Sequence, residues 1–290
     1  MKKFLFRLFK CSLFICLFYE TSNWCEKATK GFAISKISSS FPFTPGWETK
    51  KTTEEEKEKA EKALSQTFTY LSQGGQSFVF ASEDNQYVLK FFKHHRTRIP
   101  FHLNNYLPFF KKKMAQKKKK LERDFQSYKT AFNELSKETG LLYVHLNKTK
   151  DLNAKATIID PLGIKHLIEL NQMEFVLQKK AELIYPYIER KIEENNLEEV
   201  KSVIQSLIDL IVMRSQKGIF DEDAKLQRNF GVLEGRVVVI DAGRFVKDEN
   251  RKNREVYKED LKQITERLKS WLEKHSLELA QFLEEKVNDV

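Results

Sequence analysis

Apolar and polar side chains alternate between residues 67 and 92, and this alternation predicts β-strands. The stretch is rich in aromatic and branched residues, and two turn signals divide it, Gly74-Gly75 and residues 83–85. The expected strands form an antiparallel meander over residues 67–71, 77–81 and 87–92. Lys90 lies in the third strand among apolar neighbours, where it either points to solvent or faces an anionic group.

Apolar residues at a spacing of three or four predict helices in much of the remaining chain. One stripe, Leu121, Phe125, Tyr128 and Phe132, predicts a long helix that ends near residue 137. A second amphipathic helix is expected over residues 197–216, with Gly218 as its C-terminal stop. A single closing helix is expected around residues 261–272.

Two further hairpins are expected between these helices. Residues 165–170 and 174–178 read as strands joined at Asn171-Gln172, and residues 230–233 and 236–240 read as strands joined at Glu234-Gly235. The second hairpin is the more informative, because polar side chains stand at both of its ends. Folding it brings Asn229 close to Asp241, and carboxylate and amide oxygens side by side suit Mg²⁺.

Composition restricts the class of protein. The chain has 290 residues, of which 41% are hydrophobic and 32% charged, which excludes collagen-like, disordered and multispanning membrane proteins. The three cysteines, Cys11, Cys16 and Cys25, all lie in the leader, so disulfides and cysteine-based zinc sites are excluded elsewhere. The net charge of +10 permits an anionic partner without choosing among nucleotides, nucleic acids and acidic lipids.

Residues 1–25 have the pattern of a signal peptide or membrane-targeting segment. Basic residues come first, and an uncharged, mostly apolar run follows over residues 11–19. Nine residues are too few to cross a bilayer as a helix, and no A-x-A cleavage site follows. We expect a membrane-associated or exported protein, or a cytoplasmic one if the segment is only an anchor. Residues 26–63 read as a linker with a short solvated helix.

Seven lysines lie within residues 111–120, and no acidic residue interrupts them. Cations at the N-terminal end of a helix oppose its dipole, so helix stability does not explain this run. It is either a solvated face or a surface for phosphate groups or an acidic membrane. Nothing in the chain resembles a groove-reading module, so no specific nucleic-acid partner is expected.

The motifs of residues 67–245 follow one another in an order that resembles the protein-kinase-like superfamily. The run LSQGGQSFV at residues 71–79 corresponds to the glycine-rich loop, and YVLK at residues 87–90 to V-A-I-K. Further along, DEDAK at residues 221–225 corresponds to H-R-D-x-K. Asn229 corresponds to the metal-binding Asn, and DAG at residues 241–243 to D-F-G.

The resemblance implies an α/β (α+β) fold with two lobes and the use of ATP and Mg²⁺. The N-lobe, with an antiparallel sheet, would comprise residues 64–180, and a reduced helical C-lobe residues 181–290. Its implied nucleotide-binding residues are Gly74, Gly75, Val79, Lys90, Glu122, Leu177 and Gln178. In this scheme Lys90 binds the phosphates, Glu122 (or alternatively Glu134) orients Lys90, and the strand of residues 174–178 borders the adenine.

The implied metal ligands are Asn229 and Asp241, and the implied catalytic residues are Asp223 and Lys225. Asp223 would orient the acceptor hydroxyl, and Lys225 would stabilise the transferring phosphoryl group. Asp223 is separated from Asn229 by five residues instead of four, which leaves Asp221 as the alternative.

Two other functions remain open from the sequence. The reduced glycine loop and short C-lobe suit a pseudokinase or nucleotide-binding scaffold. The leader and lysine runs suit a membrane-associated basic binding protein.

Overall fold

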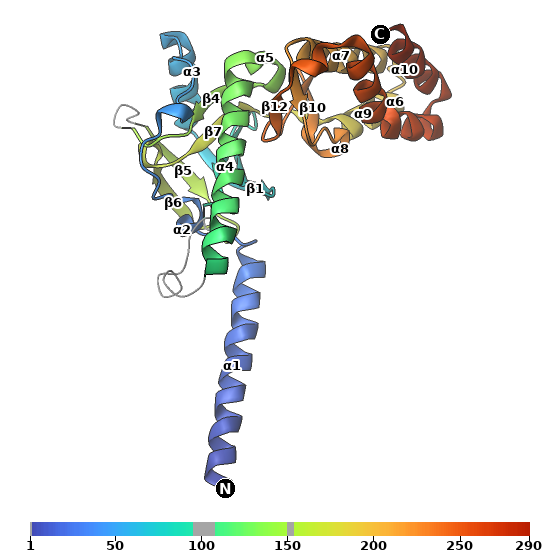
Figure 1. Ribbon diagram of the computed structural model, residues 1–290. Coiled ribbons are helices and arrows are strands. Elements are labelled where there is room, and N and C mark those ends of the chain that lie inside the picture. The colour runs from blue at the N-terminus through green and yellow to red at the C-terminus, as the bar shows by residue number, and fades with distance from the viewer. Residues whose placement is uncertain (1, 95–107, 150–153) are drawn as a thin grey trace.

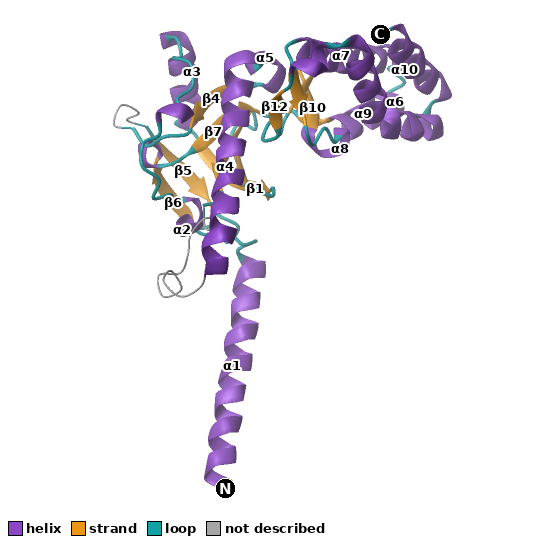
Figure 2. Cartoon of the chain, viewed as in Figure 1, coloured by secondary structure: helices purple, strands orange, loops and turns teal. Residues whose placement is uncertain are grey.

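The computed structural model describes residues 2–94, 108–149 and 154–290, and these form two lobes with a helix extending from one of them (Figure 1). The N-lobe contains the main sheet, and the C-lobe is mostly helical (Figure 2). The chain passes between them after β7, which ends at Lys179, and enters β8, Glu182–Leu183. The expected two-lobed α/β fold is confirmed.

Seven strands form the N-lobe sheet in the order β4-β7-β3-β2-β1-β5-β6. They are β1 Thr67–Gln73, β2 Ser77–Ser82, β3 Tyr87–Phe92, β4 Leu141–His145, β5 Lys155–Ile159, β6 Lys165–Glu169 and β7 Phe175–Lys179. The expected meander forms β1 to β3. All neighbouring strands are antiparallel except β1 and β5, which are parallel, so the expected antiparallel sheet has one exception.

The expected hairpin of β6 and β7 is wrong. Strand β6 pairs with β5, whereas β7 lies between β3 and β4. A 3₁₀ turn over Leu170–Gln172 separates the two strands, and Leu170 is fully buried. Strand β7 is buried along almost its whole length, so it needs neighbours on both edges and cover on both faces.

The helices of the N-lobe region are α1 Lys2–Ala28, α2 Ile34–Ile37, α3 Glu54–Leu64, α4 Pro108–Glu134 and α5 Ser136–Thr139. Helix α4 packs on the sheet face that carries Phe92 and Val176. Helices α2 and α3 supply Ile37, Ala60 and Leu64 to a second core on the opposite face. Each face of the sheet is therefore buried under its own set of helices.

The interpretation of residues 26–63 as a linker is wrong for most of its length. Its apolar residues are anchors: Trp47 packs edge-on against Phe125 of α4, with ring centroids 4.9 Å apart. Thr44 exchanges two backbone hydrogen bonds, each 3.0 Å long, with the side chain of Asn147. Helix α3 buries Leu64 and two alanines on one face and exposes most of its other residues to solvent. Burial of these few apolar side chains stabilises the packed segment, although its polar composition suggests a linker.

A buried polar cluster fastens the same segment to the sheet. The Ser39 hydroxyl donates to Glu174 Oε1 at 2.5 Å, and His94 Nε2 lies 3.1 Å from Glu174 Oε2. Burial acts to raise the pKa of Glu174, but the bonds from His94 and Ser39 outweigh it and hold that pKa below its ordinary value. His94 thus has a structural role in the N-lobe.

The C-lobe elements follow β8 in chain order. They are α6 Ile184–Glu193, α7 Leu197–Gln216, β9 Ile219–Asp221, α8 Leu226–Asn229, β10 Phe230–Leu233, β11 Arg236–Val239, β12 Phe245–Lys247, α9 Arg254–His275 and α10 Leu277–Asp289. Two helices close the chain where one was expected. Ser276 separates them and caps α10 by accepting from the amide of Leu279.

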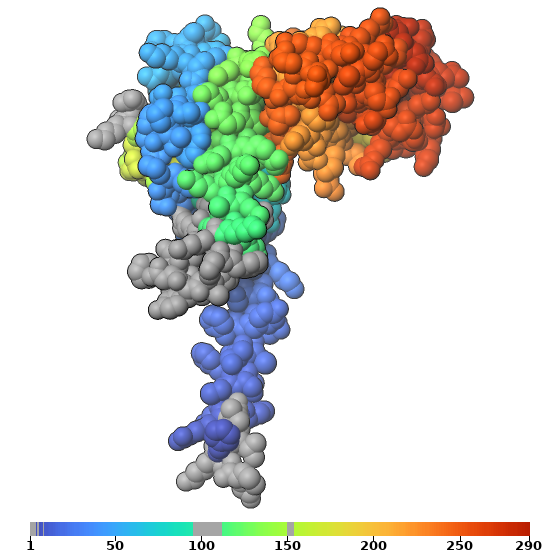
Figure 3. Space-filling model, viewed as in Figure 1, coloured from blue at the N-terminus to red at the C-terminus, as the bar shows by residue number. Residues whose placement is uncertain are grey.

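Helix α1 extends away from the lobes as a narrow stalk (Figure 3). Large apolar side chains are exposed along it, including Phe14, Phe18 and Trp24. A Schellman turn follows its last residue: Lys30 and Gly31 both have positive φ, and the amide of Gly31 donates to the carbonyl of Glu26. Within the part of the chain that the structure describes, the helices are all too short or too polar to cross a membrane.

Candidate functional site

Lys90 lies on β3 and faces α4 from the sheet. Its cross-strand neighbours are Val79 on β2 and Val176 on β7, so all three side chains share one face. Lys90 is buried, with 8% of its surface exposed, and its ammonium donates to the carbonyl of Ile240 in the C-lobe. Burial lowers the pKa of Lys90, and the negative charge of Asp241 partly opposes this. The lysine thus faces the other lobe and not solvent.

Asp241 follows β11, at the point where Lys90 reaches the C-lobe. Its Oδ1 accepts from the hydroxyl of Tyr128 and from the amide of Gly243, each at 3.2 Å. Asn229 ends α8 immediately before β10, and its carbonyl accepts from the amide of Ile240 at 2.8 Å. The hairpin therefore brings Asn229 and Asp241 to the same end, as the sequence predicts.

The loop between β9 and α8 carries Asp223 and Lys225. Lys225 Nζ lies 2.5 Å from Asp223 Oδ1, and both side chains are accessible to solvent. Asn229 Nδ2 donates to the carbonyl of Asp223 at 2.6 Å. This bond uses the amide nitrogen of Asn229 and leaves its side-chain oxygen as the atom available to a cation. The predicted catalytic pair and the predicted metal ligands therefore belong to one constellation.

Asp221 has a different environment from Asp223. It is buried, lies 3.3 Å from Arg214 of α7, and accepts from the backbone amide of Asp223 at 3.0 Å. Burial raises the pKa of Asp221, and the charge of Arg214 opposes this. Asp221 therefore holds the loop in place, whereas the carboxylate of Asp223 is accessible to solvent.

The predicted pair between Glu122 and Lys90 is not formed. Glu122 lies on the outer side of α4 and pairs with Lys118 at 3.8 Å. The apolar stripe of α4, which includes Leu121 and Tyr128, turns position 122 away from the sheet. The alternative, Glu134, pairs with Lys247 at 2.5 Å.

Sequence reasoning missed Asp124, which lies on the inner stripe of α4. It is 2% exposed, and its nearest ion-pair partner is Arg244 at 3.9 Å. Burial raises the pKa of Asp124 to about 7, an effect reduced by Arg123 and Lys120 and increased by Asp241. Its spacing of three residues from Leu121 and four from Tyr128 is the signal that could have identified it.

Helix α4 also fixes the loop after Asp241. The Ser127 hydroxyl donates to the carbonyl of Ala242 and accepts from the amide of Phe245 at 2.5 Å. Arg123 reaches Glu222, next to Asp223, at 3.2 Å. One helix of the N-lobe thus contacts both acidic loops of the C-lobe.

The glycine turn between β1 and β2 reaches the same loop. A Cβ atom at Gly74 or Gly75 would have no neighbour within 4 Å, so the backbone there borders open space. A Cβ at Gly243 would lie 2.4 Å from the side chain of Gln76. The tip of the turn therefore touches the segment that follows Asp241, and only glycine at position 243 allows this contact without a shift.

Two predicted adenine contacts have other partners. Leu177 lies on the opposite face of the sheet from Lys90, in the second core with Phe68 and Leu89. Gln178 is buried and donates to the carbonyls of Thr139 and Val239, at 2.5 and 3.3 Å. Gln178 therefore ties the sheet to the C-lobe. Alternation along β7 explains why Leu177 cannot share the face of Val79.

The residues present suit Mg-ATP. Asn229 and Asp241 offer the amide and carboxylate oxygens that Mg²⁺ prefers. Lys90 offers a desolvated cation next to them, and the open backbone at Gly74 and Gly75 leaves room for phosphates. The described residues hold no group of three or more His, Cys, Asp and Glu side chains arranged for a metal, so any cation here depends on the Asn–Asp pair.

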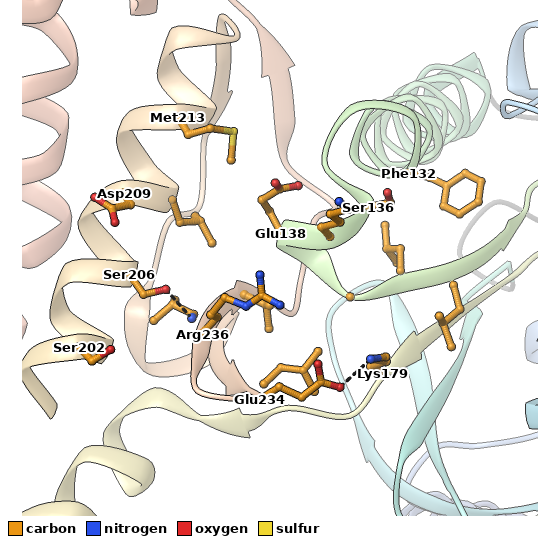
Figure 4. A pocket seen from close by; sticks show the side chains of 18 of the residues that line it. Phe132, Ser136, Glu138, Lys179, Ser202, Ser206, Asp209, Met213, Glu234 and Arg236 are labelled. Carbon is orange, nitrogen blue, oxygen red and sulfur yellow. Dashed lines mark hydrogen bonds and ion pairs between the residues drawn. The ribbon is translucent and has the colours of Figure 1, made fainter. Parts of the chain in front are cut away.

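A pocket lies away from these residues, between α5, α7 and the tip of the β10–β11 hairpin (Figure 4). Its volume is about 890 Å³. The Lys179–Glu234 ion pair, 2.7 Å long, lies at its edge, and Ser206 accepts from the amide of Val237. The lining includes no predicted site residue, so its size alone does not make it the catalytic site.

Asp124→Asn is expected to remove a pH-dependent penalty on stability. Because the pKa of Asp124 is about 7 in the folded chain and 3.8 ordinarily, wild type loses stability as the pH rises between these values. The neutral variant does not. The difference in the free energy of unfolding between variant and wild type should therefore grow in favour of the variant from pH 4 to 7. Above pH 8 it should reach roughly 2–4 kcal/mol. Urea unfolding of both proteins across this pH range measures the difference. A difference that does not change with pH would contradict the prediction that Asp124 is buried with a raised pKa.

No protein-family model and no curated protein sequence matches the chain. Three of the solved structures with some likeness are WbdD, described as a bifunctional kinase-methyltransferase, the Rv3197–erythromycin complex from Mycobacterium tuberculosis, and ADP-bound aminoglycoside phosphotransferase APH(2'')-Ib. Their identities are 15, 12 and 13%, and their TM-scores 0.36, 0.30 and 0.24.

The aligned regions cover 76, 65 and 81% of this chain and 45, 49 and 97% of those structures. The chain thus spans less than half the length of the WbdD structure it matches. These TM-scores are all below 0.5, so the likenesses do not indicate an activity for this chain.

Proposed function

We propose that the chain is an ATP- and Mg²⁺-dependent phosphotransferase of the kinase-like type. The observation that carries the proposal is the meeting of Lys90 from the N-lobe with the Asn229–Asp241 end of the C-lobe hairpin. A buried cation beside hard oxygen ligands has the chemistry needed to bind a metal-bound polyphosphate. The Asp223–Lys225 pair stands at the open side of the same constellation.

Each residue has a distinct task in this scheme. Lys90 binds phosphate oxygens; the carbonyl of Ile240 holds its ammonium at this end of the C-lobe hairpin, and the negative charge of Asp241 favours its protonated form. Asn229 and Asp241 hold Mg²⁺, which supplies charge neutralisation for the phosphates when bound. Asp223 accepts a hydrogen bond from the acceptor hydroxyl, and Lys225 compensates negative charge on the transferring group.

A nucleotide-binding scaffold without turnover is the second candidate. Three observations favour it: the Gln76 side chain lies close to Gly243, the Lys90 ammonium is bonded to a carbonyl, and Lys90 forms no ion pair with α4 within the described ranges. The two candidates share ATP binding and differ in phosphoryl transfer, so a measurement of both properties separates them.

Lys90→Ala is expected to weaken Mg-ATP binding by roughly 10- to 100-fold, because a charge-assisted bond to a phosphate oxygen contributes about 1.5–3 kcal/mol. Calorimetric titration with Mg-ATP measures this loss. Lys165→Ala, which removes a strand lysine that is exposed on β6, is the matched control and should bind as wild type does. Equal affinity in all three proteins would contradict the proposal.

A further inference from the structure

A basic pocket lies where α1 meets the sheet. A pocket of about 470 Å³ there is lined by four lysines, Lys27, Lys30, Lys36 and Lys93, against one carboxylate, Glu26. These lysines come from α1, from the segment after it and from the end of β3, so the fold gathers them from distant parts of the sequence. We call this hollow the lysine pocket.

Hydrogen bonds from two of its lysines connect the walls of the lysine pocket. Lys36 donates to the carbonyl of Gly31 at 2.8 Å and reaches Glu26 at 3.4 Å. Lys93 donates to the side chain of Gln73 at 2.6 Å and to the carbonyl of Gly74 at 2.8 Å. Lys27 forms no ion pair within the described residues. With four lysines and one carboxylate in its lining, the pocket has an excess of positive charge that an anion can neutralise.

The stalk next to this pocket is apolar on its surface. Phe14, Phe18 and Trp24 of α1 are each about two-thirds exposed, at 70, 68 and 70%. Exposed aromatic side chains in such number mark a surface that other apolar material covers. Figure 1 also shows the lysine-rich first turns of α4 directed toward the same end of the molecule as α1. The side chain of Lys111 there lies outside the described residues.

We propose that the lysine pocket binds the phosphate of an anionic lipid headgroup while α1 contacts the lipid bilayer. The combination of basic pocket and apolar helix on one end of the molecule is the reason to choose a lipid over free phosphate. The pocket borders the glycine turn through Gln73 and Lys93, so the bound headgroup lies beside the glycine turn of the candidate site. The inference is independent of phosphoryl transfer.

Cosedimentation of the full chain with vesicles tests this. The vesicles are phosphatidylcholine alone, or phosphatidylcholine mixed with phosphatidylserine. Lys27→Gln combined with Lys30→Gln should weaken binding to the mixed vesicles by roughly 30-fold, at about tenfold for every 1.4 kcal/mol and about 1 kcal/mol for each lysine. The matched control is Lys51→Gln combined with Lys62→Gln, which removes the same charge from exposed positions and should bind as wild type does.

Equal losses in the two double variants would overturn the pocket assignment, because bulk charge alone would then explain binding. A thermal-shift titration with inorganic pyrophosphate completes the test. If pyrophosphate stabilises wild type but not the pocket variant, while all proteins bind vesicles equally, the ligand is a soluble phosphate and the lipid proposal fails. Thermal unfolding of both variants without ligand shows that each is folded.

Discussion

Asp223→Asn is expected to lower the rate of phosphoryl transfer by a factor on the order of 10²–10⁴, the usual loss when a group that acts in the transition state is removed. The carboxylate of Asp223 is accessible, and its partner is the exposed side chain of Lys225. Substitution therefore leaves no buried charge without its partner, so the fold should tolerate the change. ATP binding should remain close to that of wild type.

Asp221→Asn is the informative comparison, because this aspartate is buried against Arg214. Removing one member of a buried ion pair costs about 3–5 kcal/mol, so this variant should lose stability first. Phosphate release or autophosphorylation, with melting temperature and ATP affinity for both variants, separates the roles. A larger rate loss in a folded Asp221→Asn protein would reverse the assignment. ATP binding without turnover in wild type would identify the scaffold.

Asp241→Ala is expected to abolish the dependence of ATP binding on Mg²⁺. Wild type should bind ATP more tightly with Mg²⁺ than with EDTA, whereas the variant should bind equally in both, because Asn229 alone is a poor site for a hard cation. The same variant removes the negative charge that favours the protonated form of Lys90. Its affinity for ATP without metal therefore also reports on Lys90.

Asp209→Ala is the control for this experiment, since Asp209 is an exposed aspartate on α7 that bonds only with Gln205 among the described residues. It should keep the full difference between Mg²⁺ and EDTA. Retention of that difference in Asp241→Ala would place the metal elsewhere.

Local pattern is enough to predict several elements of this fold. Strand β3 and helix α7 begin and end at the expected residues, because each has a strong period and clear stop signals. The β10–β11 hairpin is equally local, so the meeting of Asn229 and Asp241 follows from its two-residue turn. In these cases the information lies within about twenty neighbouring residues.

The wrong predictions concern features that tertiary packing determines. The choice between Glu122 and Asp124 depends on how α4 is rotated against the sheet, and the stripe of apolar residues allows either neighbour to be named. The pairing of β6 depends on β5, a strand that the sequence pattern did not predict. Residues 26–63 are mostly polar, but Trp47 and Ile37 among them are buried. The composition of a segment does not show that a few of its apolar residues are buried against the rest of the fold.

Titration of the wild-type chain with ATP, followed by thermal unfolding with Mg²⁺ and with EDTA, tests the central claim most directly. A ligand that binds only the folded state stabilises it by about 2.7 kcal/mol at a concentration one hundred times its dissociation constant. The account predicts a rise in melting temperature that grows with ATP concentration and is larger with Mg²⁺. An unchanged melting temperature at millimolar Mg-ATP would contradict it.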